Sequence, residues 1–371
     1  MRILILVDKA VDLDSASYVD ALDVSGVRRY VARIVPRFDP ERIQIQQRAL
    51  RDTHSQQADP AISFNARHLF DVAAWRRLLQ FLHTQDIELI HALGLNAAVF
   101  AAIAGGIVGI PTLASFESLA DFNAVGYIPQ MQQRVKQLIL RCGIDHVIVP
   151  SMVLRKNFWR VNYPQARIEV VYRGVDLRPA EAPVLARAAL GLPEGPLVTM
   201  IAPLVPDQGY NLLIDMMRRL LQRVPEAHLA IVGSGVLAQE LYRKTHYLPI
   251  VWLGERSDIR EIIAASDTIV VHPRQPGIPS VILEAAAAGK PVIASRASGI
   301  NEVIEHGVNG LQVTYGDSPD LAVQISRVLS QPSFQQSLGA AAQQKARSQF
   351  SLEVQRDTMT ILYESTVYGR R

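Results

Sequence analysis

The stretch of sequence that decides the fold covers residues 271–313 and reads VHPRQPGIPSVILEAAAAGKPVIASRASGINEVIEHGVNGLQV. Its apolar runs, its loop with Pro and Gly and its Ala-rich segment predict a strand, a loop, a helix and a second strand, in that order. One carboxylate, Glu284, lies on the predicted helix and is followed by residues 285–288, which are all Ala. A carboxylate buried among small residues needs a polar partner, which can be a ligand hydroxyl or the neighbouring backbone. The free N–H groups at the start of this helix, near Ser280, would favour a phosphate.

Outside this stretch, short runs rich in Val and Ile alternate with longer amphipathic segments, which is typical of parallel sheets covered by helices. In the first half we expect strands at residues 2–7, 42–46, 87–91, 112–115, 146–149 and 168–171. In the second half we expect strands at residues 197–202, 228–232, 250–253, 268–272 and 291–294. Helices are expected between the strands and, after residue 313, at residues 317–330, 333–350 and 352–368. The chain is therefore predicted to be an α/β protein with two sheets.

The break between the two sheets is expected at residues 176–196, DLRPAEAPVLARAALGLPEGP, whose four prolines and small side chains suit a linker. With 371 residues, the chain is long enough for two domains that each bury a large core. We therefore expect an N-terminal domain at residues 1–178, a C-terminal domain at residues 179–350 and a final helix at residues 351–371.

Composition argues against several classes of protein. Hydrophobic residues make up 49% of the chain and charged residues 20%, as in ordinary folded domains. Cys142 is the only cysteine, which rules out a disulfide within one chain and fits a reducing, cytoplasmic location. Residues 1–7 lack a basic flank and a cleavage-like site, so they predict a first strand and not a signal peptide. The uncharged run at residues 97–114 is broken by Pro111 and several glycines, which favours a buried helix and a buried strand over a membrane span.

The basic excess lies in the first half of the chain, where 21 basic minus 17 acidic residues up to Arg178 give +4. Three predicted helices carry most of the clusters: Arg28, Arg29, Arg33 and Arg37; Arg134, Lys136 and Arg141; and Arg155, Lys156 and Arg160. Solvated helix faces are the plainest interpretation. The second interpretation is peripheral contact with anionic lipid at the inner membrane, because each basic residue gains about 1 kcal/mol near such a surface. No recognition motif for nucleic acid accompanies the charge, so we expect no nucleic-acid partner.

Residues at fixed intervals around Glu284 resemble the motifs of the family 4 glycosyltransferases. They are Gly233, Gly235, Gly289, Pro291, Gly299, Glu302, Gly307, Asn309 and Gly310. Weaker matches are VSGVRRYVARIVPRFDPERI at residues 24–43, LIHALGLNAA at 89–98, PSMVLRKNFW at 150–159 and VYRGVDL at 171–177. The resemblance covers nearly the whole chain and implies the GT-B fold, in which two Rossmann-like doubly wound parallel-sheet domains face a central cleft. It places the donor nucleotide on the second domain and the acceptor on the first, and implies that the last helix crosses back to the N-terminal domain.

The same resemblance implies an activity. Such enzymes transfer a hexosyl unit from a nucleoside-diphosphate sugar with retention of configuration, without a metal or another cofactor. A saccharide, a lipid-linked molecule or a protein would be the acceptor, in bacterial envelope polysaccharide or glycoconjugate biosynthesis. A catalytically inactive relative that binds or stabilises a partner is the alternative.

The resemblance also assigns the candidate site. On the donor side it places Glu284 at the ribose hydroxyls, together with Gly277, Ile278, Pro279, Ser280, Gly233, Gly235 and Gln208. On the acceptor side it places Ser25, Gly26 and His91. A lone histidine at a strand end is more often a structural residue, because its neutral ring is readily satisfied by the backbone.

Departures from the family pattern fall where the chemistry would be. Pro203 and Gln208 occupy the positions of the usual donor-diphosphate Arg and Lys, Pro276 that of the first glutamate, and Glu117 that of the cleft histidine. Losing one preorganised stabilising group costs about 10²–10³ in rate. Arg173 and Arg274 could compensate, because a relocated guanidinium binds phosphate well. Glu117, Arg173 and Arg274 are therefore the catalytic candidates.

Two short patterns imitate other sites. Gly233-Ser234-Gly235 imitates a dinucleotide fingerprint, but the first strand of the chain is followed by Asp8 and no glycine loop, which argues against an NAD-dependent enzyme. Asp12-Leu13-Asp14 imitates a metal-binding motif, but oxygen-ligand sites need converging side chains, so we expect no metal.

Overall fold

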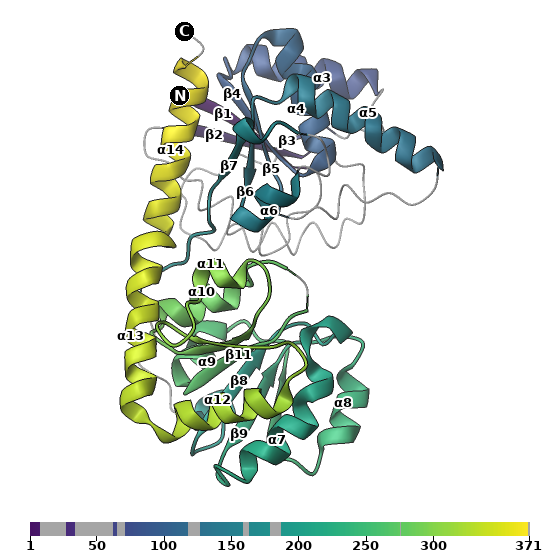
Figure 1. The fold of residues 1–371 in the computed structure, drawn as a ribbon. Coiled ribbons are helices and arrows are strands. Elements are labelled where there is room, and N and C mark those ends of the chain that lie inside the picture. Colours follow the sequence, from purple (N-terminus) through teal and green to yellow (C-terminus); the bar gives the residue numbers. More distant parts are fainter. Residues whose placement is uncertain are drawn as a thin grey trace. The chain divides into compact units, whose positions relative to one another are not determined.

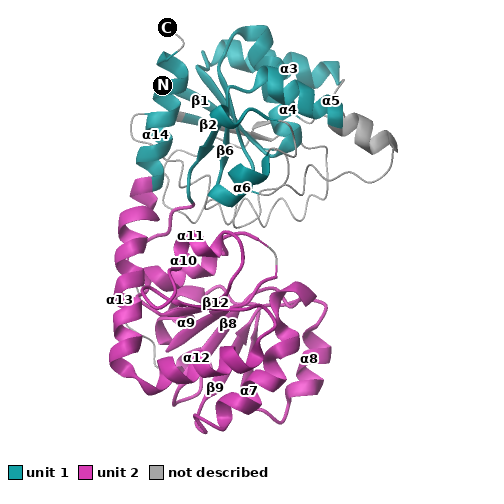
Figure 2. Ribbon diagram, viewed as in Figure 1, with its two compact units in different colours: residues 1–172, 355–371 teal, residues 173–354 magenta. Residues whose placement is uncertain are grey.

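The computed structural model of the protein describes residues 1–7, 27–33, 62–64, 71–117, 127–158, 163–178, 187–274 and 276–369. The chain forms two compact units (Figure 2). The first contains Met1–Tyr172 and Gln355–Arg371, and the second contains Arg173–Val354.

The first unit is built on a parallel sheet whose strand order, in its described part, is β3-β2-β1-β4-β5-β6-β7 (Figure 1). The strands are β1 (Arg2–Val7), β2 (Arg28–Arg33), β3 (Ile62–Ser63), β4 (Leu89–Leu93), β5 (Thr112–Ser115), β6 (His146–Val149) and β7 (Ile168–Val170). The order reverses between β1 and β4, as in doubly wound sheets.

Helices cover both faces of this sheet because the strands alternate their side chains between the faces. Leu4 and Leu6 of β1 belong to a core with α3 (Val72–Thr84), α4 (Leu95–Val108) and α5 (Tyr127–Gly143). Ile3, Ile5 and Val7 belong to a second core with α14 (Leu352–Tyr368). The last helix is therefore part of the core of the first unit from Gln355 onward.

The second unit repeats the plan with the strand order β10-β9-β8-β11-β12-β13 among its described residues. The strands are β8 (Leu197–Ile201), β9 (His228–Val232), β10 (Ile250–Gly254), β11 (Thr268–Val271), β12 (Val292–Ser295) and β13 (Leu311–Val313). The helices are α7 (Leu213–Leu221), α8 (Ala238–Thr245), α9 (Ile259–Ala265), α10 (Ser280–Ala287), α11 (Ile300–Val303), α12 (Ser318–Ser330) and α13 (Pro332–Gln349). One face of the sheet packs on α7 and α12, and residues of the other face pack on α9. The two predicted Rossmann-like doubly wound sheets are confirmed.

Two elements predicted in the first half of the chain, a helix containing residues 28–33 and a strand at residues 42–46, are not found among the described elements. Residues 28–33 were expected on a basic helix, and this was wrong: they form β2, which pairs in parallel with β1 from Arg2↔Arg28 to Val7↔Arg33. Backbone pairing with a central strand overrides the helical spacing of the arginines. The strand expected at residues 42–46 lies outside the described residues.

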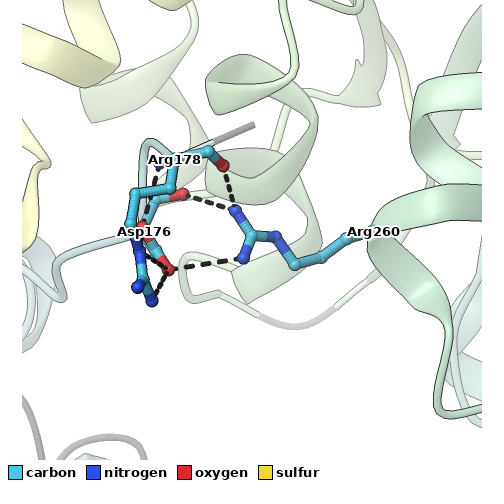
Figure 3. A network of polar contacts seen from close by, with 3 residues as sticks. All are labelled: Asp176, Arg178 and Arg260. Atoms are coloured by element: carbon cyan, nitrogen blue, oxygen red, sulfur yellow. Dashed lines mark hydrogen bonds and ion pairs between the residues drawn. The ribbon is translucent and has the colours of Figure 1, made fainter. Parts of the chain in front are cut away.

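The chain enters the second unit through a short segment that is fixed by backbone and side-chain bonds. Val175 N–H donates to Phe350 O at 2.7 Å, and Leu352 N–H donates to Val175 O at 3.3 Å. The Asp176 carboxylate accepts from the Arg178 guanidinium, with Nη2 at 2.7 Å, and from Arg260 Nη1 at 3.3 Å (Figure 3). The hydrogen bond from Arg178 is the main reason that the pKa of Asp176 is lowered.

The apolar segments lie inside the sheet units. The uncharged run at residues 97–114 forms most of α4 and β5, both largely buried, as the sequence predicts. Within the described ranges, we find no helix with the length and apolar character needed to span a bilayer.

Candidate functional site

The candidate donor site lies at the carboxyl ends of β8 and β11, where the strand order of the second unit reverses. Open parallel sheets bind ligands outside this point. The described loops that meet there are residues 202–209 after β8, 233–237 after β9, 272–274 and 276–279 after β11, 296–299 after β12 and 314–317 after β13. They contain most of the donor-side residues predicted from the sequence.

Gly233 and Gly235 bring the loop after β9 onto the loop after β8. Their φ values are 140° and 156°, and a Cβ on Gly233 would overlap the carbonyl oxygen of Ala202. A Cβ on Gly235 would lie 2.5 Å from Leu204 O. Leu204 N–H donates to Ser234 O at 2.8 Å, which closes this contact. Only glycine allows this backbone approach without a shift of the loops.

The loop after β11 is tied to its neighbours by the backbone. Arg274 N–H donates to Asp207 O at 2.8 Å in the loop after β8, and Gly277 N–H donates to Ser298 O at 2.8 Å in the loop after β12. Gly299 has φ 102°, and a Cβ there would lie 2.6 Å from Gly277 O. These three loops therefore form one connected rim.

The helix that follows this rim, α10, begins after Pro279 without a capping side chain. The first N–H groups of a helix lack partners within the helix and favour an anion. Glu284 lies in the second turn of α10 and is half-buried, whereas Ala285 and Ala286 behind it are buried. The same short helix thus brings a region of positive potential and a carboxylate to the switch point.

The other predicted donor-side positions differ in exposure. Gln208 ends a short 3-10 turn, Pro206–Gln208, and is half-buried. Arg274 and Pro276 are exposed, and Pro203 is exposed at the end of β8. Arg173 is half-buried where the chain enters the second unit.

His272 is a buried residue of this site that sequence reasoning missed. It follows β11, is 2% exposed, and accepts a hydrogen bond at Nε2 from Gly316 N–H at 3.2 Å. Burial lowers its pKa to about 4. Its ring stacks on Tyr315 with centroids 5.1 Å apart. The strand prediction included His272, but nothing in the sequence indicated that residues 315 and 316 would meet it.

The first unit contains His91, predicted on the acceptor side, and Glu117, one of the catalytic candidates. His91 is fully buried in β4, where Nδ1 lies 2.8 Å from Tyr363 Oη and Nε2 lies 2.7 Å from Ser115 Oγ. Burial lowers its pKa to about 3. This geometry gives the imidazole a structural task, and its acceptor-side role stays a prediction. Glu117 is exposed just beyond β5.

Other predicted residues of the first half cannot be placed. Ser25, Gly26 and the Asp12-Leu13-Asp14 pattern lie outside the described residues.

Several glycosyltransferase-like motif residues support the scaffold. Asn309 is buried, donates from Nδ2 to Val303 O at 2.9 Å and accepts at Oδ1 from Glu305 N–H at 2.7 Å. Gly307 N–H donates to Gly310 O at 2.8 Å in the same turn. These bonds close the turn that leads into β13.

Comparisons with known proteins agree with this geometry. Residues 24–178 match the family described as Glycosyltransferase Family 4, and residues 195–331 match the family described as Glycosyl transferases group 1. The lipopolysaccharide core biosynthesis glycosyltransferase LpsD of Rhizobium meliloti is 30% identical over 60% of this chain and 64% of its own length. The sulfoquinovosyl transferase SQD2 of Arabidopsis thaliana is 24% identical over 70% of this chain and 53% of its own length. The chain thus spans only about half to two thirds of the length of these two relatives.

A solved structure, that of HepE from Anabaena in complex with UDP, is similar over 98% of this chain and 100% of its own. The TM-score is 0.81 at 24% identity. This likeness confirms the predicted GT-B fold.

Proposed function

Since the chain belongs to the group 1 glycosyltransferases of family 4, we propose that it transfers a hexosyl unit from a nucleoside-diphosphate sugar to an acceptor with retention of configuration. The observation that carries this proposal is α10, whose uncapped first turn and half-buried Glu284 both lie at the switch point of the second sheet. The loops after β8, β9, β11, β12 and β13 form the walls around it, and we call this site of the second unit the donor half-site.

The two ends of the donor nucleotide would use different parts of the half-site. The diphosphate oxygens would accept from the N–H groups at the start of α10, because the helix dipole and a first turn without a side-chain cap favour negative charge. The Glu284 carboxylate would accept from the two ribose hydroxyls. Charge-assisted hydrogen bonds of this kind are stronger than neutral ones. Gly233 and Gly235 would shape the wall of the nucleotide site, since only glycine lets their loop lie this close against the loop after β8.

The transfer step builds negative charge on the departing nucleoside diphosphate, and electrostatic stabilisation usually supplies the largest part of such catalysis. Arg274 is exposed in the loop after β11 and belongs to the connected rim. Arg173 is the second candidate. We propose that either guanidinium supplies the charge that Pro203 and Gln208 cannot.

An inactive relative that binds a nucleotide or stabilises a partner is the second candidate function. The neutral side chains of Pro203, Gln208 and Pro276 favour it, because no charged side chain stands at these three donor-side positions. The glycine framework and Glu284 would still support nucleotide binding in such a protein.

The acceptor and the setting are also proposals. LpsD is named for lipopolysaccharide core biosynthesis and SQD2 for sulfoquinovosyl transfer. We propose a saccharide, lipid-linked or protein acceptor in envelope glycoconjugate assembly, with the chain on the cytoplasmic side and in peripheral contact with anionic lipid.

Calorimetric titration with UDP, GDP, dTDP and their sugars, paired with a donor-hydrolysis assay, tests the proposal. Glu284→Ala should weaken nucleotide binding about tenfold or more, because hydrogen bonds to a charged group contribute about 1.5–3 kcal/mol. Glu240→Ala removes an exposed carboxylate from α8 in the same unit and is the matched control. Arg173→Ala and Arg274→Ala, tested separately, should lower turnover if that guanidinium stabilises the leaving group.

Three outcomes are decisive. Binding with turnover supports the transferase, whereas binding without turnover supports the inactive relative. A folded protein that binds no nucleotide contradicts the transferase and leaves only an inactive relative that stabilises a partner.

A further inference from the structure

We propose that His272 is a positioning residue of the donor half-site, which holds the loops after β8 and β13 against the loop after β11. The inference rests on the proposed donor role of these loops and adds a residue that holds them in position. His272 would act through the loops and would not touch the reacting atoms.

The face of the sheet on which His272 lies follows from strand alternation. Val270, two residues earlier, packs in the core shared with α7 and α12. Side chains two apart on a strand point to the same face, so His272 lies at the carboxyl edge of that face. Its ring therefore sits beneath the loops and not beside α10, where Glu284 lies.

The loop after β13 is bound to His272 in two ways. Gly316 N–H donates to Nε2, and the Tyr315 ring stacks on the imidazole with an interplanar angle of 14°. These contacts lie directly before α12, which begins two residues later at Ser318 and is capped by the Asp317 side chain.

The loop after β8 approaches His272 from the other side. Gly209 has φ 80°, and a Cβ there would lie 2.7 Å from His272 Cδ2 and 2.8 Å from His272 O. Arg274 N–H, two residues after His272, donates to Asp207 O in the same loop. The buried Ser295 hydroxyl at the end of β12 donates to Pro273 O at 2.7 Å. One residue and its neighbours thus connect the ends of β8, β12 and β13.

The chemistry of the ring suits this task. A backbone N–H donates to Nε2, so Nε2 is the unprotonated nitrogen and the neutral ring carries its hydrogen on Nδ1. Nδ1 has no hydrogen-bond partner among the described residues. A replacement must therefore reproduce the acceptor at the position of Nε2 and need not reproduce a donor at Nδ1.

Three substitutions separate positioning from packing. His272→Phe keeps a ring for Tyr315 but removes the acceptor. His272→Gln can place an amide oxygen near the position of Nε2, whereas the side chain of His272→Asn is too short to reach Gly316. His246→Phe makes the same chemical change at an exposed histidine of the second unit and is the matched control.

Hydrogen exchange and UDP titration distinguish these variants. Hydrogen exchange without nucleotide should be faster in His272→Phe than in the wild type, both at residues 314–316 and at residues 202–209, and should be restored in His272→Gln only. UDP titration should give a dissociation constant raised about tenfold in His272→Phe, the upper end of what one hydrogen bond contributes. His272→Gln should recover most of that affinity and His272→Asn should not.

The two readouts keep this inference separate from the proposed function. If the wild type binds no nucleotide, the proposed function fails, and the exchange measurement still decides the role of His272. Unchanged exchange at residues 202–209 in His272→Phe would overturn the inference. Equal UDP affinity in His272→Phe and the wild type, or recovery by His272→Asn as complete as by His272→Gln, would overturn it as well.

Discussion

Acidification should destabilise the first unit through one buried residue, His91. The imidazole is 0% exposed, and burial lowers its pKa to about 3 from the ordinary histidine value of 6.5. Between these two values the unfolded chain binds a proton that the folded unit does not bind, so stability falls as pH falls. The contribution is fully present above about pH 6.5 and is lost progressively from there down to about pH 3. Between pH 8 and pH 5 the loss is about 2 kcal/mol, since one pKa unit corresponds to about 1.4 kcal/mol.

The assay compares the wild type with His91→Gln, which does not titrate. Trp75 of the first unit stacks on Phe100 with centroids 4.7 Å apart, so its fluorescence reports on this unit. In a background with Trp159→Phe and Trp252→Phe, urea unfolding followed by Trp75 fluorescence at pH 8 and pH 5 gives the free energy of unfolding of this unit. We expect the wild type to lose about 2 kcal/mol more than His91→Gln over this range.

The control for this measurement is His83→Gln, because His83 is an exposed histidine on α3 of the same unit. It should keep the wild-type difference between pH 8 and pH 5. A wild-type unit that is equally stable at both pH values would refute the reasoning. The same conclusion would follow if His91→Gln showed the full wild-type loss, since the titrating group would then lie elsewhere.

Two further predictions concern the first unit. Gly105→Ala should destabilise it by about 1–3 kcal/mol, because the added Cβ would overlap Thr112 Cγ2 and lie 2.7 Å from Ile110 O. Gly106→Ala, the next residue of α4, has open space and should stabilise it by about 0.5–1 kcal/mol, and opposite signs in urea unfolding check the pair. The α5 helix contains no Asp or Glu and exposes Val135, Leu138, Arg134 and Arg141, so the protein should sediment with anionic vesicles more than with zwitterionic ones. The double variant Arg134→Gln, Arg141→Gln should bind anionic vesicles about tenfold or more weakly. The control double variant Arg243→Gln, Lys244→Gln on α8 should bind them as the wild type does. Equal recovery of the protein with anionic and zwitterionic vesicles would count against the lipid contact.

The buried strands could be predicted because central parallel strands are continuous apolar runs with little ambiguity. The strands at residues 112–115, 146–149 and 228–232 have the predicted bounds. The prediction for residues 28–33 failed for a physical reason: RRYVAR is short and rich in arginine, and its pairing with β1 and β3 makes it a strand. Local sequence does not contain that pairing partner.

The residues of the candidate site divide in the same way. Gly233, Gly235 and Gly299 could be predicted as site residues because positive φ and close backbone approach both require glycine, and a required glycine is visible in the sequence. His272 could not be selected, since its environment comes from residues 209, 315 and 316 on two distant loops. No local sequence pattern indicates a residue that acts by joining loops.

The shape and the charge of the donor half-site depend on different residues, and this makes binding and catalysis separable. Shape depends on glycines, on the rim bonds between Arg274 and Asp207 and on the uncapped start of α10. In the proposed site, charge would come from Arg173 or Arg274, whichever guanidinium reaches the diphosphate. Because Pro203 and Gln208 carry no charge, the proposed site could bind a nucleotide and still stabilise its leaving group poorly. Nucleotide affinity therefore measures whether the scaffold is intact, and turnover at saturating donor measures whether the charge has been replaced.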